Sequence, residues 1–321
     1  MRAVVTAILT VTLTAAWVYA GDSRKDDPGQ IGNRDVGKGI NFYSLDKEIA
    51  LGRQLAQEVT RQAKLVDDPL ITEYLNRVGQ NLARNSDAKV PFTFRLIDAP
   101  DVNAFALPGG YVFVYAGLIR VADEEDELAG ALAHEIAHVA ARHYTRQATK
   151  SDIATAASIP LSVLLGGWAG LAARQAAGLA VPMTLLSFGR KDETEADYLG
   201  VQYMYSAGYD PTGAISIFEK MEALARQKPG LISRAFASHP MDADRIEKTE
   251  KEIQAILPGR PEYIVTTSDY TEMRRRLLAR VSSKEKEQEN RPTLRRPRPA
   301  ADSNSGEDPE SRPTIRRHFI D

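Results

Sequence analysis

The segment His134-Glu135-Ile136-Ala137-His138 decides how the rest of this sequence of 321 residues is interpreted. If the segment is helical, positions four apart lie on one face, so the two imidazoles can hold one metal ion at about 2.0–2.1 Å. Glu135 then lies on an adjacent face, where its carboxylate can take a proton from a water on the metal. The spacing therefore predicts that His134 and His138 are metal ligands and that Glu135 is a general base.

The residues around this motif favour a buried helix over a chance match on a surface helix. The neighbouring apolar positions are Ala131, Leu132, Ala133, Ile136, Ala137, Val139 and Ala140. Two buried histidines beside a glutamate need polar partners, and a metal ion supplies one. The charges at either end suit the helix dipole, which predicts one helix that opens at Asp123–Asp126 and closes over Arg142–Lys150.

A metal site of this type needs a third protein ligand and keeps one position open. His143 lies about 140° around a continuous helix from His138, so we expect it at the surface or the helix end, pointing away from the metal. Glu193 and Asp197 share one face of a second predicted helix. Glu193 can be the third ligand, and Asp197 can support a ligand histidine. Taken alone, such an acidic helix start is usually a solvated cap, and the upstream motif favours the functional interpretation.

The motif at 134–138, combined with Glu193-Thr-Glu-Ala-Asp197, resembles the gluzincin peptidases grouped with the HtpX heat-shock protease, the CAAX prenyl protease and the periplasmic peptidase BepA. The similarity runs from about Leu45 to Leu257. It implies a zinc-dependent endopeptidase with one Zn²⁺ per chain and with Glu193 as the third ligand. The serine that is usual near the start of the second helix is Gly189 here, which leaves that start open.

The sequence Ser238-His239-Pro240, followed by Arg245, resembles the His-Pro element of the same family. The resemblance implies that His239 acts at the metal. It would either block the ion and give a latent enzyme, or steady the oxyanion that forms on a substrate carbonyl. The alternative is a plain loop histidine beside a proline turn.

The sequence Asn103-Ala104-Phe105-Ala106 resembles the edge strand over which gluzincins lay extended substrates. Pairing of main chain with main chain would let such an edge bind peptides of many sequences. The resemblance implies that Asn103, Ala104 and Phe105 bind substrate. The alternative is an ordinary hairpin strand with Phe105 in the core.

The rest of the sequence predicts a helix-rich α+β fold of the zincin type, with a small β-hairpin or sheet at the active-site edge. Alternating residues at 92–98 and the turn Pro108-Gly109-Gly110 predict a strand followed by a hairpin. Helix starts are predicted near Ser44, Pro69, Asp192, Pro211 and Asp242. The predicted metallopeptidase domain covers residues 42–281.

The N-terminal part is predicted to be a signal peptide over residues 1–20, followed by a flexible leader over residues 21–41. Arg2 precedes an apolar run, which indicates export to the periplasm. The run is also close to the length that spans a bilayer, so a retained membrane anchor is the alternative.

Two later segments are predicted to contact partners. Residues 154–188 are almost uncharged apart from Arg174, and their glycines and prolines favour an apolar lid or a membrane-surface loop over a spanning hairpin, with a buried core helix as a third alternative. The charged, proline-rich tail at 282–321 is expected to be disordered. It repeats Arg-Pro-Thr at Arg291 and Arg312, which indicates either a docking motif for a partner or a chance similarity.

Composition narrows the classes of function. The chain contains no cysteine, so any metal must bind to histidines and carboxylates. The 41 basic and 43 acidic residues argue against a nucleic-acid partner, which would need a basic excess. By the family resemblance, the expected substrates are unfolded or misassembled envelope proteins, so the expected role is protein quality control. A second hypothesis is a latent, chaperone-like binding protein whose zinc site is closed by His239.

Overall fold

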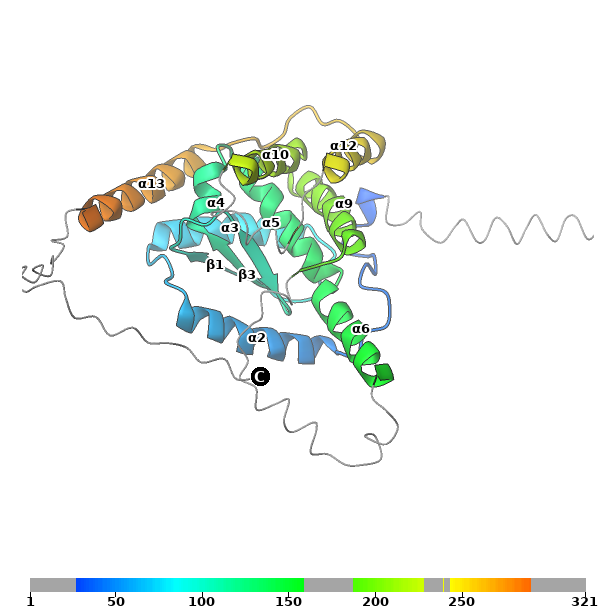
Figure 1. The fold of residues 1–321 in the computed structure, drawn as a ribbon. Coiled ribbons are helices and arrows are strands. Elements are labelled where there is room, and N and C mark those ends of the chain that lie inside the picture. Colours follow the sequence, from blue (N-terminus) through cyan, green and yellow to red (C-terminus); the bar gives the residue numbers. More distant parts are fainter. Residues whose placement is uncertain (1–26, 159–186, 228–238, 240–242, 290–321) are drawn as a thin grey trace, which may run out of the picture. The chain divides into compact units, whose positions relative to one another are not determined.

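Figure 1 shows the computed structural model, which describes residues 27–158, 187–227, 239 and 243–289. The predicted signal peptide at 1–20, most of the apolar stretch at 154–188 and the Arg-Pro-Thr repeats lie outside these residues. The chain divides after Val281 into two units, and the sheet and the motif helix belong to the first.

In the described residues, helices pack around one small sheet. In chain order the elements are η1 (Pro28–Gln30), α2 (Leu45–Gln62), α3 (Pro69–Arg84), β1 (Thr93–Ile97), β2 (Ala104–Leu107), β3 (Tyr111–Tyr115), α4 (Ala116–Val121), α5 (Glu125–Ala140), α6 (His143–Ser158), α9 (Arg190–Ala207), α10 (Thr212–Gln227), α12 (Ala243–Ile256) and α13 (Ser268–Glu289). The predicted class, a helix-rich α+β fold with a small sheet, is confirmed.

Capping residues explain where several helices begin and end. The Ser44 hydroxyl accepts a hydrogen bond from the backbone of Lys47 at the start of α2. The Asp68 carboxylate caps α3, and Pro69 occupies the first turn, where its missing N–H costs nothing. α9 ends at Gly208, whose φ of 92° is the left-handed conformation that glycine adopts readily. Local sequence therefore accounts for these boundaries.

The sheet has the strand order β1-β3-β2, with β1 parallel and β2 antiparallel to β3. Gly109 and Gly110 make the turn between β2 and β3 with φ of 72° and 88°, a region that favours glycine. A Cβ on Gly110 would also lie 2.1 Å from the carbonyl oxygen of Pro91. Within the described sheet β2 is an edge strand, so one side of its backbone does not pair with another strand.

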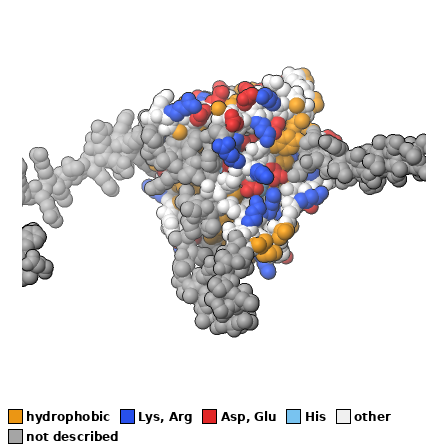
Figure 2. Space-filling view, turned by 45° about the vertical axis from the view of Figure 1, so that its right-hand side comes forward, with side chains coloured by type: hydrophobic (Ala, Val, Ile, Leu, Met, Phe, Trp, Pro, Cys, Tyr) orange, Lys and Arg blue, Asp and Glu red, His pale blue; other side chains and the backbone are white. Residues whose placement is uncertain are grey.

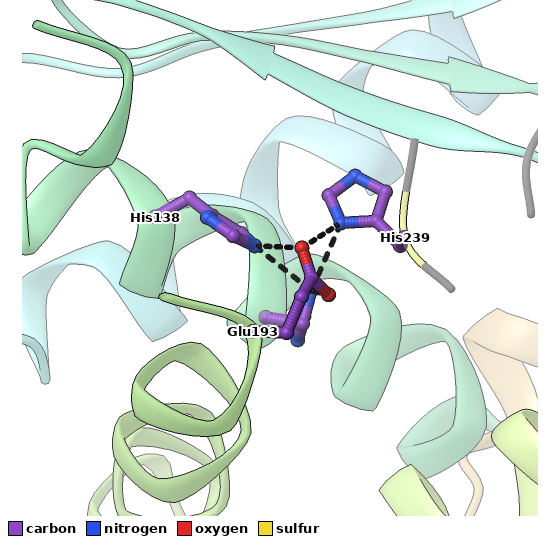
Figure 3. Close-up of side chains that lie close together, drawn as sticks. His138, Glu193 and His239 are labelled. Atoms are coloured by element: carbon purple, nitrogen blue, oxygen red, sulfur yellow. Dashed lines mark hydrogen bonds and ion pairs between the residues drawn. The ribbon is translucent and has the colours of Figure 1, made fainter. Parts of the chain in front are cut away.

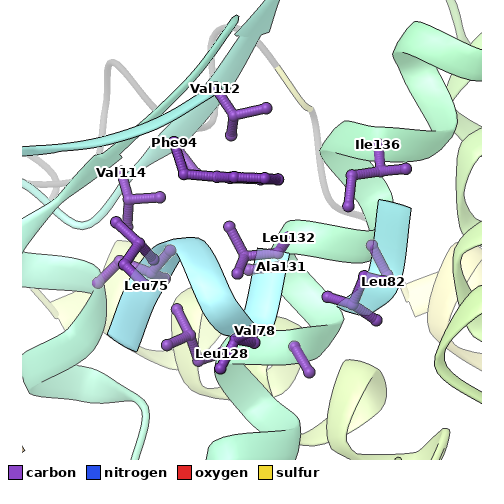
Figure 4. Close-up of a cluster of buried hydrophobic side chains, with 14 of the residues drawn as sticks. Leu75, Val78, Leu82, Phe94, Val112, Val114, Leu128, Ala131, Leu132 and Ile136 are labelled. Carbon is purple, nitrogen blue, oxygen red and sulfur yellow. The ribbon is translucent and has the colours of Figure 1, made fainter. Parts of the chain in front are cut away.

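The two faces of the sheet bury different side chains, as the alternation of a strand requires. One face packs on α3 and α5, and Figure 4 shows this cluster around Leu75, Val78, Leu82, Phe94, Val112, Val114, Leu128, Ala131, Leu132 and Ile136. The opposite face packs on Leu55 and Ala56 of α2. On that face Phe105 stacks on Phe113, with ring centroids 5.3 Å apart. The side chain of Phe105 therefore belongs to the core.

The motif helix α5 lies at the centre of the first unit. All of its residues, from Glu125 to Ala140, are buried, so the predicted burial is confirmed. It packs against β2, α3, α9 and α10. Gly200 lets α9 approach closely, because a Cβ at this position would lie 3.3 Å from the backbone nitrogen of His134.

The prediction of a flexible leader at 21–41 is wrong for its described residues. The buried Arg34 guanidinium donates to both carboxylate oxygens of Asp87, and the shortest of these bonds is 2.6 Å. Asp87 also accepts from the hydroxyl of Tyr203 on α9 at 3.0 Å. Val36 lies in the main hydrophobic core. The folded part therefore begins earlier than predicted.

The single helix predicted from Asp123 to Lys150 is also wrong. α5 ends at Ala140 and α6 begins at His143, because Arg142 between them has a left-handed φ of 57°. Such a backbone is costly for a residue other than glycine. The Arg142 side chain offsets the cost by donating to Glu48 of α2 at 2.8 Å.

The C-terminal helix α13 differs from the prediction as well. It continues through Glu289, so the predicted disorder of the tail from residue 282 is wrong for residues 282–289. The hydroxyl of Tyr270 on this helix donates to the carbonyl of Ala122 at 2.6 Å, which ties its start to the chain just before α5.

The described surface carries mixed charge. Figure 2 shows Lys and Arg side chains among Asp and Glu side chains on one face. Ion pairs also form within single helices, such as Lys248 with Glu252 on α12. Among the described residues, no helix combines the length and the apolar content needed to cross a bilayer.

Replacing Arg34 by methionine should destabilise the fold, because the buried Asp87 carboxylate would lose its cation. We expect the free energy of unfolding to fall by about 3–5 kcal/mol, the range for breaking one side of a buried ion pair. Urea unfolding followed by circular dichroism measures this. Arg61→Met is the matched control, since the Arg61 side chain is 70% exposed. Equal stabilities of the two variants would contradict the assignment.

Candidate metal centre

Four side chains meet at one point in the first unit, and Figure 3 labels three of them, His138, Glu193 and His239. His134 and His138 come from α5, Glu193 from the first turn of α9, and His239 from the chain between α10 and α12. The Nε2 atoms of the two α5 histidines are 3.0 Å apart, and the Glu193 carboxylate lies 3.5 Å from each. His239 Nδ1 lies 3.0 Å from Glu193 and 3.3 Å from His134. The structure thus brings together the three predicted ligands and the predicted His239.

The spacing of these atoms fits one small divalent ion. All four ligand atoms lie within 4.8 Å of one another. A tetrahedral ion with bonds of about 2.0–2.1 Å would separate its ligand atoms by about 3.3–3.4 Å. The separations between nitrogen and oxygen atoms given above, 3.0 to 3.5 Å, bracket that value. Two imidazoles and a carboxylate are also a ligand set that zinc accepts.

The charges around this point also favour a cation. The carboxylates of Glu135, Glu193 and Asp197 are all buried here, and Arg245 is the guanidinium in contact with two of them. With neutral histidines, three carboxylates and one guanidinium leave two negative charges. A divalent ion would balance these charges, and buried charges need such balance.

The pKa values of the ligand side chains also reflect the charges at this point. Burial lowers the pKa of His134, but Asp197 and Glu193 outweigh burial and raise this pKa to about 10. Burial raises the pKa of Glu193, but His239 and His134 outweigh it and hold this pKa below its usual value. The carboxylates therefore stabilise positive charge at His134, whereas burial lowers the pKa of His138 and keeps that ring neutral, as a metal ligand must be.

The outer nitrogen of His134 is held by a carboxylate. Asp197 Oδ1 lies 2.9 Å from His134 Nδ1, and Asp197 is one turn of α9 beyond Glu193. Arg245 of α12 donates two hydrogen bonds of 2.8 Å to Asp197 and lies 3.0 Å from Glu193. Such contacts fix the ring so that Nε2 faces the metal position. The sequence placed Asp197 beside a ligand histidine, but it did not predict that Arg245 contacts both carboxylates.

The Glu135 carboxylate lies between the metal position and the sheet edge. Its Oε2 accepts a hydrogen bond of 2.8 Å from the backbone N–H of Ala106 in β2, and its Oε1 lies 3.5 Å from His239 Nε2. Burial raises the pKa of Glu135, although the neighbouring His239 opposes the effect. A carboxylate with a raised pKa can accept a proton and return it at neutral pH.

His143 lies where the sequence did not predict it. The expectation was a histidine at the surface or the helix end that points away from the metal. His143 is the first residue of α6, but its side chain is fully buried and its Nδ1 lies 2.8 Å from Nδ1 of His138, so the expected exposure and direction are wrong. The predicted angle assumed one continuous helix, whereas the left-handed Arg142 turns the chain back toward His138. Phe188 stacks on the same ring at 4.2 Å between centroids, a contact that no sequence pattern indicated.

The predicted substrate-binding strand is only partly at the site. Asn103 and Ala104 line a pocket with His134 and Glu135, whereas the Phe105 ring packs on the opposite face of the sheet. The position of the Phe105 ring in the core is the one that the alternative, an ordinary hairpin strand, predicted. The Asn103 carbonyl accepts from the backbone of Tyr115 at 2.9 Å. Alternation along an antiparallel pair then turns the N–H and C=O of Ala104 toward the free edge.

Comparisons with known proteins agree with this geometry. The model of peptidase family M48 matches residues 69–253. The beta-barrel assembly-enhancing protease of Escherichia coli K12 is 30% identical over 250 residues, which cover 75% of this chain and 50% of that protein. The mitochondrial metalloendopeptidase OMA1 of Schizosaccharomyces pombe is 35% identical over 223 residues, which cover 66% and 63%. The metalloprotease LoiP of Escherichia coli K12 is 28% identical over 253 residues, which cover 77% and 96%.

The chain spans about half the length of the beta-barrel assembly-enhancing proteases it matches. The family model, at residues 69–253, covers all four side chains of the metal centre.

Removing the Glu193 carboxylate should abolish stable metal binding. Glu193→Ala leaves only the two imidazoles of α5 unless His239 substitutes, so we expect little metal to survive gel filtration. Elemental analysis of the purified chain measures the metal content. Glu135→Gln is the matched control, because it alters a neighbouring buried carboxylate outside the set of ligand atoms, and it should keep its metal. Equal metal content in the two variants would contradict the ligand assignment.

Proposed function

The chain belongs to peptidase family M48 and is a metalloprotease, and from this premise we propose that it is a zinc-dependent endopeptidase acting on unfolded or misassembled envelope proteins. The resemblance predicted from its motifs is thereby confirmed at the level of the family. One observation carries the proposal: the convergence of His134, His138 and Glu193 at one point, with Glu135 between that point and the edge strand β2.

The chemistry assigns separate tasks to the metal and to the chain. When bound, the ion supplies Lewis acidity, which polarises the scissile carbonyl and acidifies a water. Glu135 would take the proton from the attacking water and pass it to the leaving amine, a cycle suited to a buried carboxylate with a raised pKa. Asp197 would keep His134 in the tautomer that presents Nε2 to the ion.

The surroundings of Glu135 favour an extended, apolar peptide as substrate. The outward backbone groups of Ala104 can pair with a substrate strand without reading its side chains. The pocket beside them is lined in part by Leu118, Phe218 and Met221, which offer an apolar surface to one substrate side chain. Unfolded proteins present both an unpaired backbone and exposed apolar side chains, whereas folded proteins bury them.

The biological setting is inferred from the sequence and from the relatives. The apolar N-terminal run supports export to the periplasm, and the relatives named beta-barrel assembly-enhancing proteases support a role in envelope quality control. Contact with the membrane surface through residues 154–188 and a docking partner for the Arg-Pro-Thr repeats are part of the same proposal.

A second candidate function is a latent, chaperone-like binding protein. His239 favours it, because its Nδ1 belongs to the same group of possible ligand atoms as the three predicted ligands. A catalytic zinc site needs an open position for water and substrate. With His239 in this place the fourth corner would be filled, and cleavage would require His239 to leave.

Hydrolysis of casein by wild type, Glu135→Gln and His239→Ala tests both candidates. We expect Glu135→Gln to lose activity by about 10²–10⁴-fold, the range for a general base, while it retains its metal. We expect His239→Ala to cleave faster than wild type, because the fourth corner is free. Measuring bound metal in each variant separates loss of chemistry from loss of the ion.

Other outcomes decide between the candidates. If Glu135→Gln cleaves as fast as wild type, the proposed general base is wrong. If every variant binds metal, none cleaves casein and each keeps a heat-denatured client soluble, the binding-protein candidate takes precedence.

Ala104→Pro tests the proposed strand addition. The substitution removes an N–H that faces the free edge, so the ladder between β2 and β3 loses no hydrogen bond. We expect a higher KM for unfolded substrate, an unchanged kcat and unchanged metal content. An unchanged KM in a folded variant would argue against backbone pairing at this edge. Ala106→Pro is the contrasting variant, because the Ala106 N–H binds Glu135 and its loss should lower kcat.

A further inference from the structure

The ligand histidine His138 is backed by a second histidine, and we propose that His143 positions His138 for the metal through a hydrogen-bonded chain that ends at Glu195. His143 is a positioning residue in this inference and does not touch the ion. The inference rests on the proposed metal site and is independent of the proposed substrate.

The chain of contacts runs outward from the metal position. The Nε2 of His138 faces His134 and Glu193, so Nδ1 is its outer nitrogen. That atom lies 2.8 Å from His143 Nδ1, and His143 Nε2 lies 3.2 Å from Glu195 Oε2. The His143 side chain is fully buried, so no solvent replaces either contact.

The positions of the protons follow from these contacts. A histidine that binds a metal through Nε2 carries its proton on Nδ1, so His138 must donate to His143 Nδ1. His143 therefore holds its own proton on Nε2 and donates it to the Glu195 carboxylate. Each ring therefore has one tautomer. Because Glu195 accepts the proton of His143, it fixes the tautomer of His143 directly and that of His138 through His143. Without an acceptor beneath it, His138 could place its proton on the nitrogen that the metal requires.

The two histidines of α5 are thus supported in different ways by one helix. α9 supplies Glu193 to the metal position, Asp197 directly to His134, and Glu195 to His138 by way of His143. The indirect support depends on the break after α5, because the left-handed residue between α5 and α6 brings His143 beneath His138.

A second metal ion is a weaker explanation of the same cluster. His143, Asp192 and Glu195 lie close enough to share an ion. Arg146 already lies 3.3 Å from Glu195 and Lys150 lies 4.0 Å from Asp192, so both carboxylates have cations beside them. An ion on His143 Nε2 would also place the His143 proton on Nδ1, where it would face the Nδ1 proton of His138 across 2.8 Å.

Metal affinity of the full chain, measured by competition with a zinc chelator, tests the inference without reference to activity. His143→Leu fills the space but offers no acceptor, and we expect its zinc affinity to fall by about 10–100-fold. His143→Asn places its amide oxygen near the position of Nδ1, so it can still accept from His138 and should recover most of the affinity. The absorption spectrum of the cobalt(II)-loaded chain should change in His143→Leu and resemble wild type in His143→Asn.

Thr149→Val is the matched control. It lies on the same helix α6 and loses a hydrogen bond of 3.0 Å to the backbone of Phe42, so it should lower stability and leave zinc affinity unchanged. A folded His143→Leu variant with wild-type affinity and cobalt spectrum would overturn the inference, and so would an Asn variant no better than Leu. Wild-type chain that binds zinc but cleaves no casein would count against the proposed function alone. Wild-type chain that binds neither zinc nor cobalt would overturn both.

Discussion

Burying three carboxylates beside three imidazoles is the constraint on which the arrangement of the first unit depends. Such a cluster is stable only if each charge is balanced and each ring nitrogen has a defined partner. Helices α5, α9 and α12 meet here because each contributes part of that balance. The Arg245 guanidinium contacts both Glu193 and Asp197, yet it leaves a deficit of positive charge at the centre. A divalent ion at the point where the ligand atoms converge would therefore also balance the remaining negative charge.

Residues far from the motif in sequence hold this centre in place. Glu48 on α2 accepts from Arg142, and that bond supports the left-handed turn at which the motif helix ends. Arg34 near the start of the described chain pairs with Asp87, which in turn accepts from α9. The segment before α2 thus contributes to the position of the helix that carries Glu193, although it contributes no residue to the metal position.

The sequence predicted the parts of the fold and site that depend on short-range spacing. The separation of His134 and His138 implies one helical face, and the Pro108-Gly109-Gly110 turn implies a hairpin, because each depends on local backbone geometry. Prediction from the sequence failed where a residue distant in the chain determines the conformation. Arg34 looked like part of a mobile leader because Asp87 lies 53 positions away. His143 looked like a surface residue because the break before it depends on α2.

The free edge of β2 has a consequence for how such an enzyme would choose its substrates. An edge that binds through Ala104 backbone groups cannot distinguish a damaged protein from a healthy one by its side chains alone. What differs between them is the time for which a segment stays extended and unpaired. If the proposed function holds, refolding of the client competes with its binding to β2. Proteins that fold slowly would then be cleaved, and proteins that fold quickly would not.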